Sequence, residues 1–324
     1  LASGGNYVKL QTNTSNPTPT PTTQTGVGPR STPATPNGIA VPASIDKTGT
    51  TDVTAALQSW INSQPNGTAS NPTVLIFPAG ATYLMNTGLR VDNKSYITFW
   101  GYGATLRPMG NGSTSGNSGF RLQNSNFIKI FGFRIKGANT DAGTANAYHS
   151  GGFEYSMGVA LVNNSDDVEI ADNWINHVFG DAIYISYDPT GYPDRINIHH
   201  NLLELAGRQG IVPDSGVDNR IEWNIIRDIA MSAIDAEDAR GASVSLGPLY
   251  IRNNLIDRWT WSGDYTCHAL PMDYAAGTLS SMHDIYIENN TFQGGCMAPS
   301  GTAGYPNTQD ADISMWGTMA KSNI

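Results

Sequence analysis

Acidic side chains recur on short apolar strands in the middle of the sequence. Three such strands are predicted, and they read Gly180-Asp-Ala-Ile-Tyr-Ile185, Arg208-Gln-Gly-Ile-Val212 and Ser232-Ala-Ile-Asp-Ala236. Side chains alternate between the two faces of a strand, so aligning the isoleucine that starts each apolar pattern directs the nearby acids outward. On this register Asp214, Asp235 and Glu237 become neighbours on one face, and they are the candidate catalytic residues.

Paired carboxylates at this spacing suit two kinds of chemistry. Neighbouring parallel strands would place Asp214 about 5 Å from Glu237, with Asp235 about 7 Å away along the same face. Glycoside hydrolysis needs one acid and one base or nucleophile at such distances, and a close pair raises the pKa of one member. Alternatively, several carboxylates could bind Ca²⁺, which would neutralise a uronate sugar for a lyase reaction. The structural alternative for each acid is a solvated turn or a bond to a neighbouring coil.

Six further side chains are candidates for substrate binding. Arg208 could hold a sugar carboxylate. A lyase would need a base, for which Arg208, His268 and Tyr184 are the alternatives. Gln209 aligns with Asp181 and Ser232 where the second strands begin. Aromatic residues in the long insertions suit sugar rings, although they could equally seal the loops onto the core. The six candidates are Tyr184, Arg208, Gln209, Trp261, His268 and Asp273.

A repeated pattern brings these strands together. Each acidic strand follows an alternating apolar stretch with an asparagine near its end, and Asn173, Asn201 and Asn224 are 28 and 23 residues apart. Two more copies follow at 249–256 and 284–292. A period in this range predicts a β-solenoid, whose coils must stack because none covers its own apolar side chains. Asparagines at tight bends could then bond from coil to coil; the alternative is an asparagine-rich β-sandwich.

A short amphipathic helix is predicted ahead of the coils, over residues 53–62. Thr51 or Asp52 is the expected N-cap. The expected apolar face consists of Val53, Ala56, Leu57, Trp60 and Ile61. Such a helix would cover the bare cross-section at the end of a solenoid.

The same region carries a resemblance to a known family. Asp46-Lys-Thr-Gly-Thr-Thr-Asp-Val-Thr-Ala-Ala-Leu-Gln58, Val74-Leu-Ile-Phe-Pro-Ala-Gly80 and Gly101-Tyr-Gly-Ala-Thr-Leu106 resemble the opening coils of the pectate-lyase-like single-stranded right-handed β-helix superfamily. That group includes secreted polysaccharide lyases and hydrolases, and phage tailspikes. The resemblance covers roughly Ile39 to the C-terminus and implies an all-β right-handed parallel β-helix. It transfers no catalytic residue, because the motifs close the end of the helix and do no chemistry.

Composition narrows the classes of partner. Charged residues make up 14% of the chain, the net charge is −9, and basic residues form no cluster, so nucleic acid is not an expected partner. No run of eighteen apolar residues occurs, so no membrane span is expected. Cys267 and Cys296 lie about one repeat apart, and stacked coils could bring them within disulfide range; two buried thiols are the alternative.

The chain divides into two parts by composition. Residues 1–37 form an extended N-terminal segment with a Pro/Thr-rich linker, read as a spacer or stalk, and residues 38–324 form the β-helix domain. No clear cap follows Trp316, so the solenoid is either truncated or completed by another chain.

These observations predict an extracellular protein directed at a polysaccharide. The first hypothesis is a secreted lyase or glycoside hydrolase that cleaves a glycan in a groove across the coils. No cofactor is certain, and Ca²⁺ is the candidate metal. The alternative is a phage tail protein or tailspike on the virion surface that binds a host glycan, with or without cleaving it; a homotrimer is the oligomer expected of a tailspike. A third reading is a non-catalytic adhesion or structural solenoid.

Overall fold

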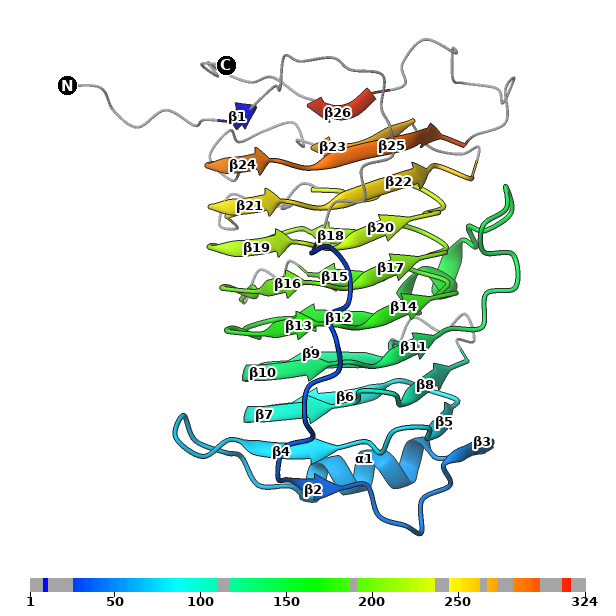
Figure 1. Ribbon diagram of the computed structural model, residues 1–324, viewed down its shortest axis with the longest axis vertical. Coiled ribbons are helices and arrows are strands. Elements are labelled where there is room, and N and C mark those ends of the chain that lie inside the picture. Colours follow the sequence, from blue (N-terminus) through cyan, green and yellow to red (C-terminus); the bar gives the residue numbers. More distant parts are fainter. Residues whose placement is uncertain are drawn as a thin grey trace, which may run out of the picture.

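The strands of this chain wind in stacked coils around one axis. The computed structural model describes residues 8–10, 26–109, 117–186, 191–236, 245–262, 267–272, 282–297 and 311–315. Within this part of the chain, every named strand runs parallel to its neighbours (Figure 1). Successive strands belong in turn to a ten-stranded, a nine-stranded and a five-stranded sheet. The chain is therefore a right-handed parallel β-helix, as the sequence predicts.

Two of the three sheets run the length of the helix, and the five-stranded sheet covers the coils from β6 (Leu89–Asp92) to β18 (Ile211–Pro213). The ten-stranded sheet has the order β1 (Val8–Leu10), β24 (Ile285–Glu288), β21 (Leu249–Arg252), β19 (Asn219–Glu222), β16 (Asn197–His199), β13 (Glu169–Ala171), β10 (Asn126–Phe131), β7 (Ser95–Trp100), β4 (Thr73–Ile76) and β2 (Ile39–Ala40). The nine-stranded sheet has the order β25 (Thr291–Cys296), β22 (Leu255–Trp259), β20 (Ile225–Arg227), β17 (Leu202–Glu204), β14 (Trp174–Asn176), β11 (Arg134–Lys136), β8 (Thr105–Pro108), β5 (Thr82–Met85) and β3 (Thr48–Asp52). The five-stranded sheet has the order β18 (Ile211–Pro213), β15 (Ile183–Ile185), β12 (Val159–Val162), β9 (Phe120–Gln123) and β6 (Leu89–Asp92). A separate pair joins β23 (His268–Met272) to β26 (Ala311–Met315).

Aliphatic side chains fill the interior in rows along the axis. In the ten-stranded sheet the register places one isoleucine per coil in line, and every member of the row is buried. The row consists of Ile170, Ile198, Ile221, Ile251 and Ile287. Each coil therefore buries its apolar face only by stacking on the next coil, which is why the pattern must repeat.

Asparagines line the bend between the ten-stranded and nine-stranded sheets. The Nδ2 group of Asn173 donates to Asn201 Oδ1 at 3.0 Å, and Asn201 donates in the same way to Asn224 at 3.0 Å. The series continues through Asn254 to Asn290 at 3.1 and 2.9 Å. The predicted coil-to-coil ladder is confirmed. Each predicted alternating stretch is in fact two strands that the asparagine bend separates, so a coil has three strands.

Helix α1 (Thr54–Ser63) packs at the first coil, as predicted. Its buried face consists of Leu57, Trp60 and Ile61. Val53 occupies the N-cap position, so the predicted cap was wrong: Asp52 instead accepts hydrogen bonds from Thr54 N and Oγ1 at 3.0 and 2.6 Å. Ala56 was also misplaced, because it faces solvent. No helix in the described part of the chain is long and apolar enough to cross a membrane.

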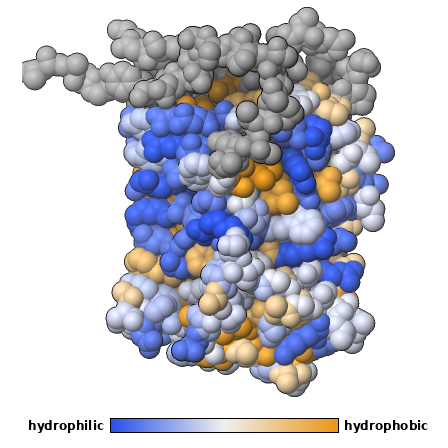
Figure 2. Space-filling model, in the orientation of Figure 1, coloured by the Kyte–Doolittle hydropathy of each residue, from blue (hydrophilic) through white to orange (hydrophobic). Residues whose placement is uncertain are grey.

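The N-terminal strap, residues 26–38, lies along the outside of the coils. In Figure 1 it is the dark blue trace that crosses the coils on its way to β2, and Figure 2 shows the largely hydrophilic face that carries it. Arg30 donates from its backbone N, Nε and Nη2 to the Asp172 carboxylate at 3.0, 2.9 and 2.7 Å. Gly28 N donates to Trp223 O at 2.8 Å. Further back in the chain, β1 pairs with β24 of the last coil. These described parts of the predicted spacer therefore bind the helix.

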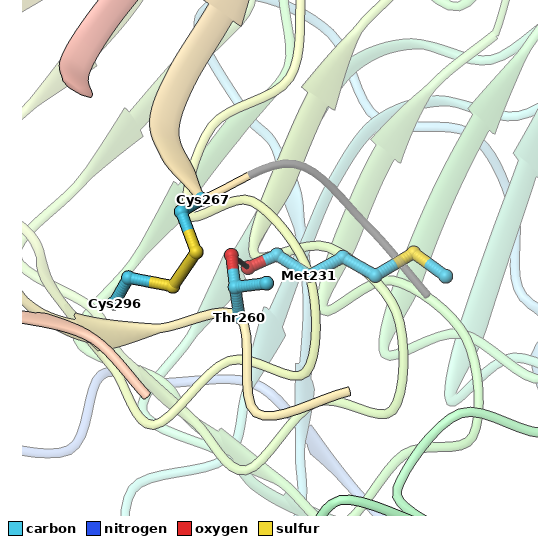
Figure 3. Close-up of a disulfide and its surroundings, with 4 residues drawn as sticks. All are labelled: Met231, Thr260, Cys267 and Cys296. Carbon is cyan, nitrogen blue, oxygen red and sulfur yellow. Dashed lines mark hydrogen bonds between the residues drawn. A yellow bond between two sulfur atoms is a disulfide. The ribbon is translucent and has the colours of Figure 1, made fainter. Parts of the chain in front are cut away.

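A disulfide joins two of the last coils. Cys267 and Cys296 are bonded, with their Cα atoms 5.3 Å apart, so the predicted bridge is confirmed and the free-thiol alternative is wrong. Thr260 and Met231 lie beside it, where Thr260 Oγ1 donates to Met231 O at 3.3 Å (Figure 3). The bridge connects the start of β23 to the end of β25. It therefore links β25, the edge strand of the nine-stranded sheet, to β23.

Candidate functional site

The predicted register of the acidic strands is confirmed. Ile183 pairs with Ile211 through β15 and β18, and Ile211 forms a parallel bridge with Ile234 on the next coil. This register aligns Tyr184, Val212 and Asp235 in one column on the outer side of the five-stranded sheet. Ser186 and Asp214 form the adjacent column. Glu237, which was predicted to continue that column, lies outside the described residues.

Asp214 forms a hydrogen-bonded group with Tyr184. Burial raises the pKa of the Tyr184 hydroxyl, and the nearby Asp214 charge and its hydrogen bond raise that pKa further. The Tyr184 hydroxyl therefore stays protonated at neutral pH and donates a hydrogen bond to the Asp214 carboxylate. Ser186 also bonds the Tyr184 side chain, which opposes part of this pKa shift. The Asp214 side chain is buried, with 3% of its surface exposed.

A second group connects Asp181, Arg208, Gln209 and Asp235 across three coils. Arg208 Nη1 forms an ion pair with Asp181 at 3.1 Å, and the Gln209 backbone N donates to Asp181 Oδ1 at 3.0 Å. Gln209 Nε2 donates to Asp235 Oδ2. Arg208, predicted as a free clamp for a sugar carboxylate, is thus paired with a fully buried acid of the preceding coil. Asp181 was noted in the sequence only for its alignment, which was the signal that could have identified it as this partner.

The two outward acids are less accessible than the strand pattern predicted. Asp235 is 2% exposed, and Val212 in the same column is fully buried. Outward-facing residues on a lone strand would be solvated, but here Asp214, Val212 and Asp235 are all buried. Tyr184 and Ser186 are half-buried, so the column opens toward solvent at β15.

The remaining predicted binding residues lie apart from each other. His268 is the first residue of β23 and is 4% exposed; the bridge between Ala236 and Met272 places it beside Ser232, next to the Gln209 group. Trp261 is half-buried, and its backbone N donates to Ile229 O at 3.4 Å. Asp273 lies outside the described residues, so its predicted role stays a prediction.

Aromatic side chains of one insertion pack on the protein itself. The segment 139–155 ends in the 3₁₀ helix η1 (Gly151–Tyr155). His149, Phe153 and Phe179 stack on one another with ring centroids 4.7 to 5.7 Å apart. Asn139 Nδ2 donates to Ala147 O at 2.8 Å and closes the loop. For these rings the alternative interpretation is correct, since they seal the insertion onto the turn that precedes β15.

The described carboxylates do not fit a Ca²⁺ site. No group of three or more His, Cys, Asp or Glu side chains among the described residues is arranged to hold a metal ion. Asp181 is neutralised by Arg208, and the hydrogen-bond partners identified for Asp214 and Asp235 are the neutral Tyr184 and Gln209 side chains.

Comparisons with known proteins return structures of related shape. No family model matches the sequence, and no curated protein matches it. An alginate lyase from Paenibacillus sp. superposes with a TM-score of 0.45 at 17% identity, covering 75% of this chain and 96% of that one. Pectate lyase C from Erwinia chrysanthemi gives 0.43 at 15%, covering 64% and 56%. A surface adhesin of Streptococcus pneumoniae gives 0.43 at 12%, covering 79% and 81%. At these values the likeness says nothing about activity, and the fold rests on this chain's own strand pairing.

Proposed function

We propose that this protein cleaves a glycan at the outer side of the five-stranded sheet, with Asp214 and Asp235 as an acid–base pair. The carrying observation is their register, because the Ile211–Ile234 bridge fixes the two acids on adjacent coils. One strand spacing and two residues along the strand separate their Cα atoms by about 8 Å. Carboxyl pairs of inverting glycoside hydrolases stand ~6.5–9.5 Å apart, which leaves room for a water molecule.

The neighbours of each acid suggest its role. Tyr184 keeps its proton and donates to Asp214, which favours the carboxylate form of Asp214, so we assign Asp214 as the base that activates water. Asp235 is assigned as the acid that protonates the leaving oxygen because it is the other member of the pair; Gln209 Nε2 donates to its Oδ2 atom and fixes its orientation. The Asp181–Arg208 pair anchors this arrangement from the preceding coil.

Two further observations support a glycan as substrate and an extracellular location. The opening coils resemble those of polysaccharide-acting β-helix proteins, and the Cys267–Cys296 disulfide is typical of oxidising compartments. Secretion and display on a virion are both compatible with a disulfide. The homotrimer expected of a tailspike stays a prediction, to be checked by light scattering.

The test is reducing-end release from a panel of polysaccharides, with ultraviolet absorbance of unsaturated products to detect a lyase. Asp214→Asn and Asp235→Asn should each lower the hydrolytic rate by about 10²- to 10⁴-fold, because each removes an acid–base group. Asp218→Asn is the matched control, since Asp218 is an exposed acid on the ten-stranded sheet side. Cleavage that both site variants retain would refute the assignment, and glycan binding without cleavage would favour the adhesion reading.

A further inference from the structure

The outer side of the five-stranded sheet also carries two arginines at its other end. Arg90 of β6 and Arg121 of β9 are paired directly in the parallel register. Their strands alternate strictly, with buried Leu89, Val91 and Phe120 facing the core, so both arginines point outward. They share a column with Ala160, Tyr184, Val212 and Asp235.

The local contacts leave this arginine pair with excess positive charge. Arg121 Nη1 and Arg90 Nη2 both donate to Gln123 Oε1, a neutral acceptor, at 2.6 and 3.2 Å. Asp92 accepts from Arg90 Nε at 2.9 Å. Within the described part of the chain, Arg121 has no carboxylate partner in ion-pair distance. Burial lowers the pKa of Arg121 and the adjacent Arg90 charge lowers it further, whereas the Asp92 charge opposes part of this shift; the lowering by the Arg90 charge shows that the two arginines repel each other.

Like charges directly opposite each other destabilise a sheet, so the Arg90–Arg121 pair is unfavourable without a counter-charge. It is a local positive site in a chain whose net charge is −9. An anion placed between the two guanidinium groups would remove the repulsion and satisfy both forks. We propose that Arg90 and Arg121 form a subsite for an anionic group of the glycan, a uronate carboxylate or a sulfate ester.

The distance to the acids defines how the glycan lies. Three strand spacings separate Arg121 from the coil of Asp214 and four separate it from Asp235, which is about 14 to 19 Å along the axis. The spacing of one coil is close to the length of one sugar residue in an extended glycan. Between the two ends the column holds Ala160, half-buried Tyr184 and Val212, and of these Tyr184 is the one that reaches solvent. The glycan therefore lies along the helix axis, with its anionic group three to four sugars from the cleaved bond.

This position relative to the cleaved bond rests on the proposed function, whereas anion binding by the two arginines does not. The test is calorimetric titration of the full chain with hexasaccharides of mannuronate, galacturonate and κ-carrageenan, with cellohexaose as the neutral probe. Arg121→Gln and Arg90→Gln should each weaken binding of the preferred anionic probe by about tenfold, since each removes a charge-assisted hydrogen bond. Arg220→Gln, on the ten-stranded sheet, is the matched control and should stay within about twofold of wild type.

The outcomes separate this inference from the proposed function. Preference for uronates or for the sulfated probe identifies the anionic group. Absence of binding by every anionic probe overturns the subsite, as does Arg121→Gln behaving like the Arg220→Gln control. Arginine-dependent binding without any cleavage would leave the subsite standing and remove the acid–base assignment. If Asp214→Asn loses cleavage while neither arginine variant changes binding, the acid–base assignment stands and the arginine subsite is overturned.

Discussion

Replacing Asn224 by alanine should cost much of the stability of the middle coils. The Asn224 amide donates to Asn254 Oδ1, Ile198 O and Glu222 O at 3.1, 2.9 and 3.1 Å. Its Oδ1 atom accepts from both the backbone N and the Nδ2 group of Asn201 at 3.0 Å. The substitution removes all five bonds from a fully buried site.

The magnitude follows from the groups left without a partner. The buried backbone N–H of Asn201 loses its acceptor, which costs about 1–3 kcal/mol, and the other four bonds contribute about 0.5–1.5 kcal/mol each, so the free energy of unfolding should fall by about 4 kcal/mol or more. Asn290→Ala, at the end of the ladder, breaks fewer bonds and should cost about half as much. Asn62→Ala is the control, because Asn62 is exposed on α1 and accepts one bond, from Gln58.

Urea unfolding followed by circular dichroism measures these differences, and hydrogen exchange locates them in the coils. The ladder explanation requires the order Asn224, Asn290, Asn62 from most to least destabilising. If Asn224→Ala unfolds at the same urea concentration as Asn62→Ala, the amide ladder does not stabilise the coils and the reasoning is wrong.

Two further predictions concern the strap and the disulfide. Arg30→Ala should lower the free energy of unfolding by about 1–3 kcal/mol near neutral pH, because the Asp172 side chain is 2% exposed while the Arg30 side chain is half in solvent. Burial alone would raise the pKa of Asp172, but hydrogen bonds from Arg30 and Tyr102 outweigh burial and lower that pKa. The stabilisation by Arg30 is therefore complete above about pH 4 and is lost as the pH falls further. A difference in melting temperature between wild type and variant that stays constant from about pH 6 to pH 3 would contradict this. Serine at both Cys267 and Cys296 should cost about 3.5 kcal/mol, since the bond closes a loop with a sequence separation of 29. Reduced wild type should match that variant in urea unfolding, and an unchanged midpoint in both would contradict the estimate.

The sequence predicts the coils better than it predicts the surface. Ile198 and Asn201 recur with the period of the coil because each must meet an identical neighbour, so their pattern is visible in one chain. Asp52 has the side chain of a typical N-cap and accepts a hydrogen bond from Thr54 N, the first residue of the helix. The N-cap position itself is nevertheless occupied by Val53. A local pattern of this kind cannot fix the boundary.

The candidate site shows the same division. The alignment of Tyr184 with Asp235 follows from alternation and could be predicted from the sequence. The burial of Asp235 could not, because alternation gives the direction of a side chain and not its exposure. The Arg208–Asp181 pair joins different coils, and only the three-dimensional register shows which acid the arginine meets.

The contact between β1 and β24 has a consequence for how the molecule is made. Val8 pairs with Ile285, so β1 binds a strand that is synthesised long after it. Among the described strand pairs, this one joins the residues farthest apart in sequence, and it must wait until the coils between have formed. Until then the terminal edge of the newly made helix stays open to strands of other chains, and aggregation during synthesis should be greatest in this interval.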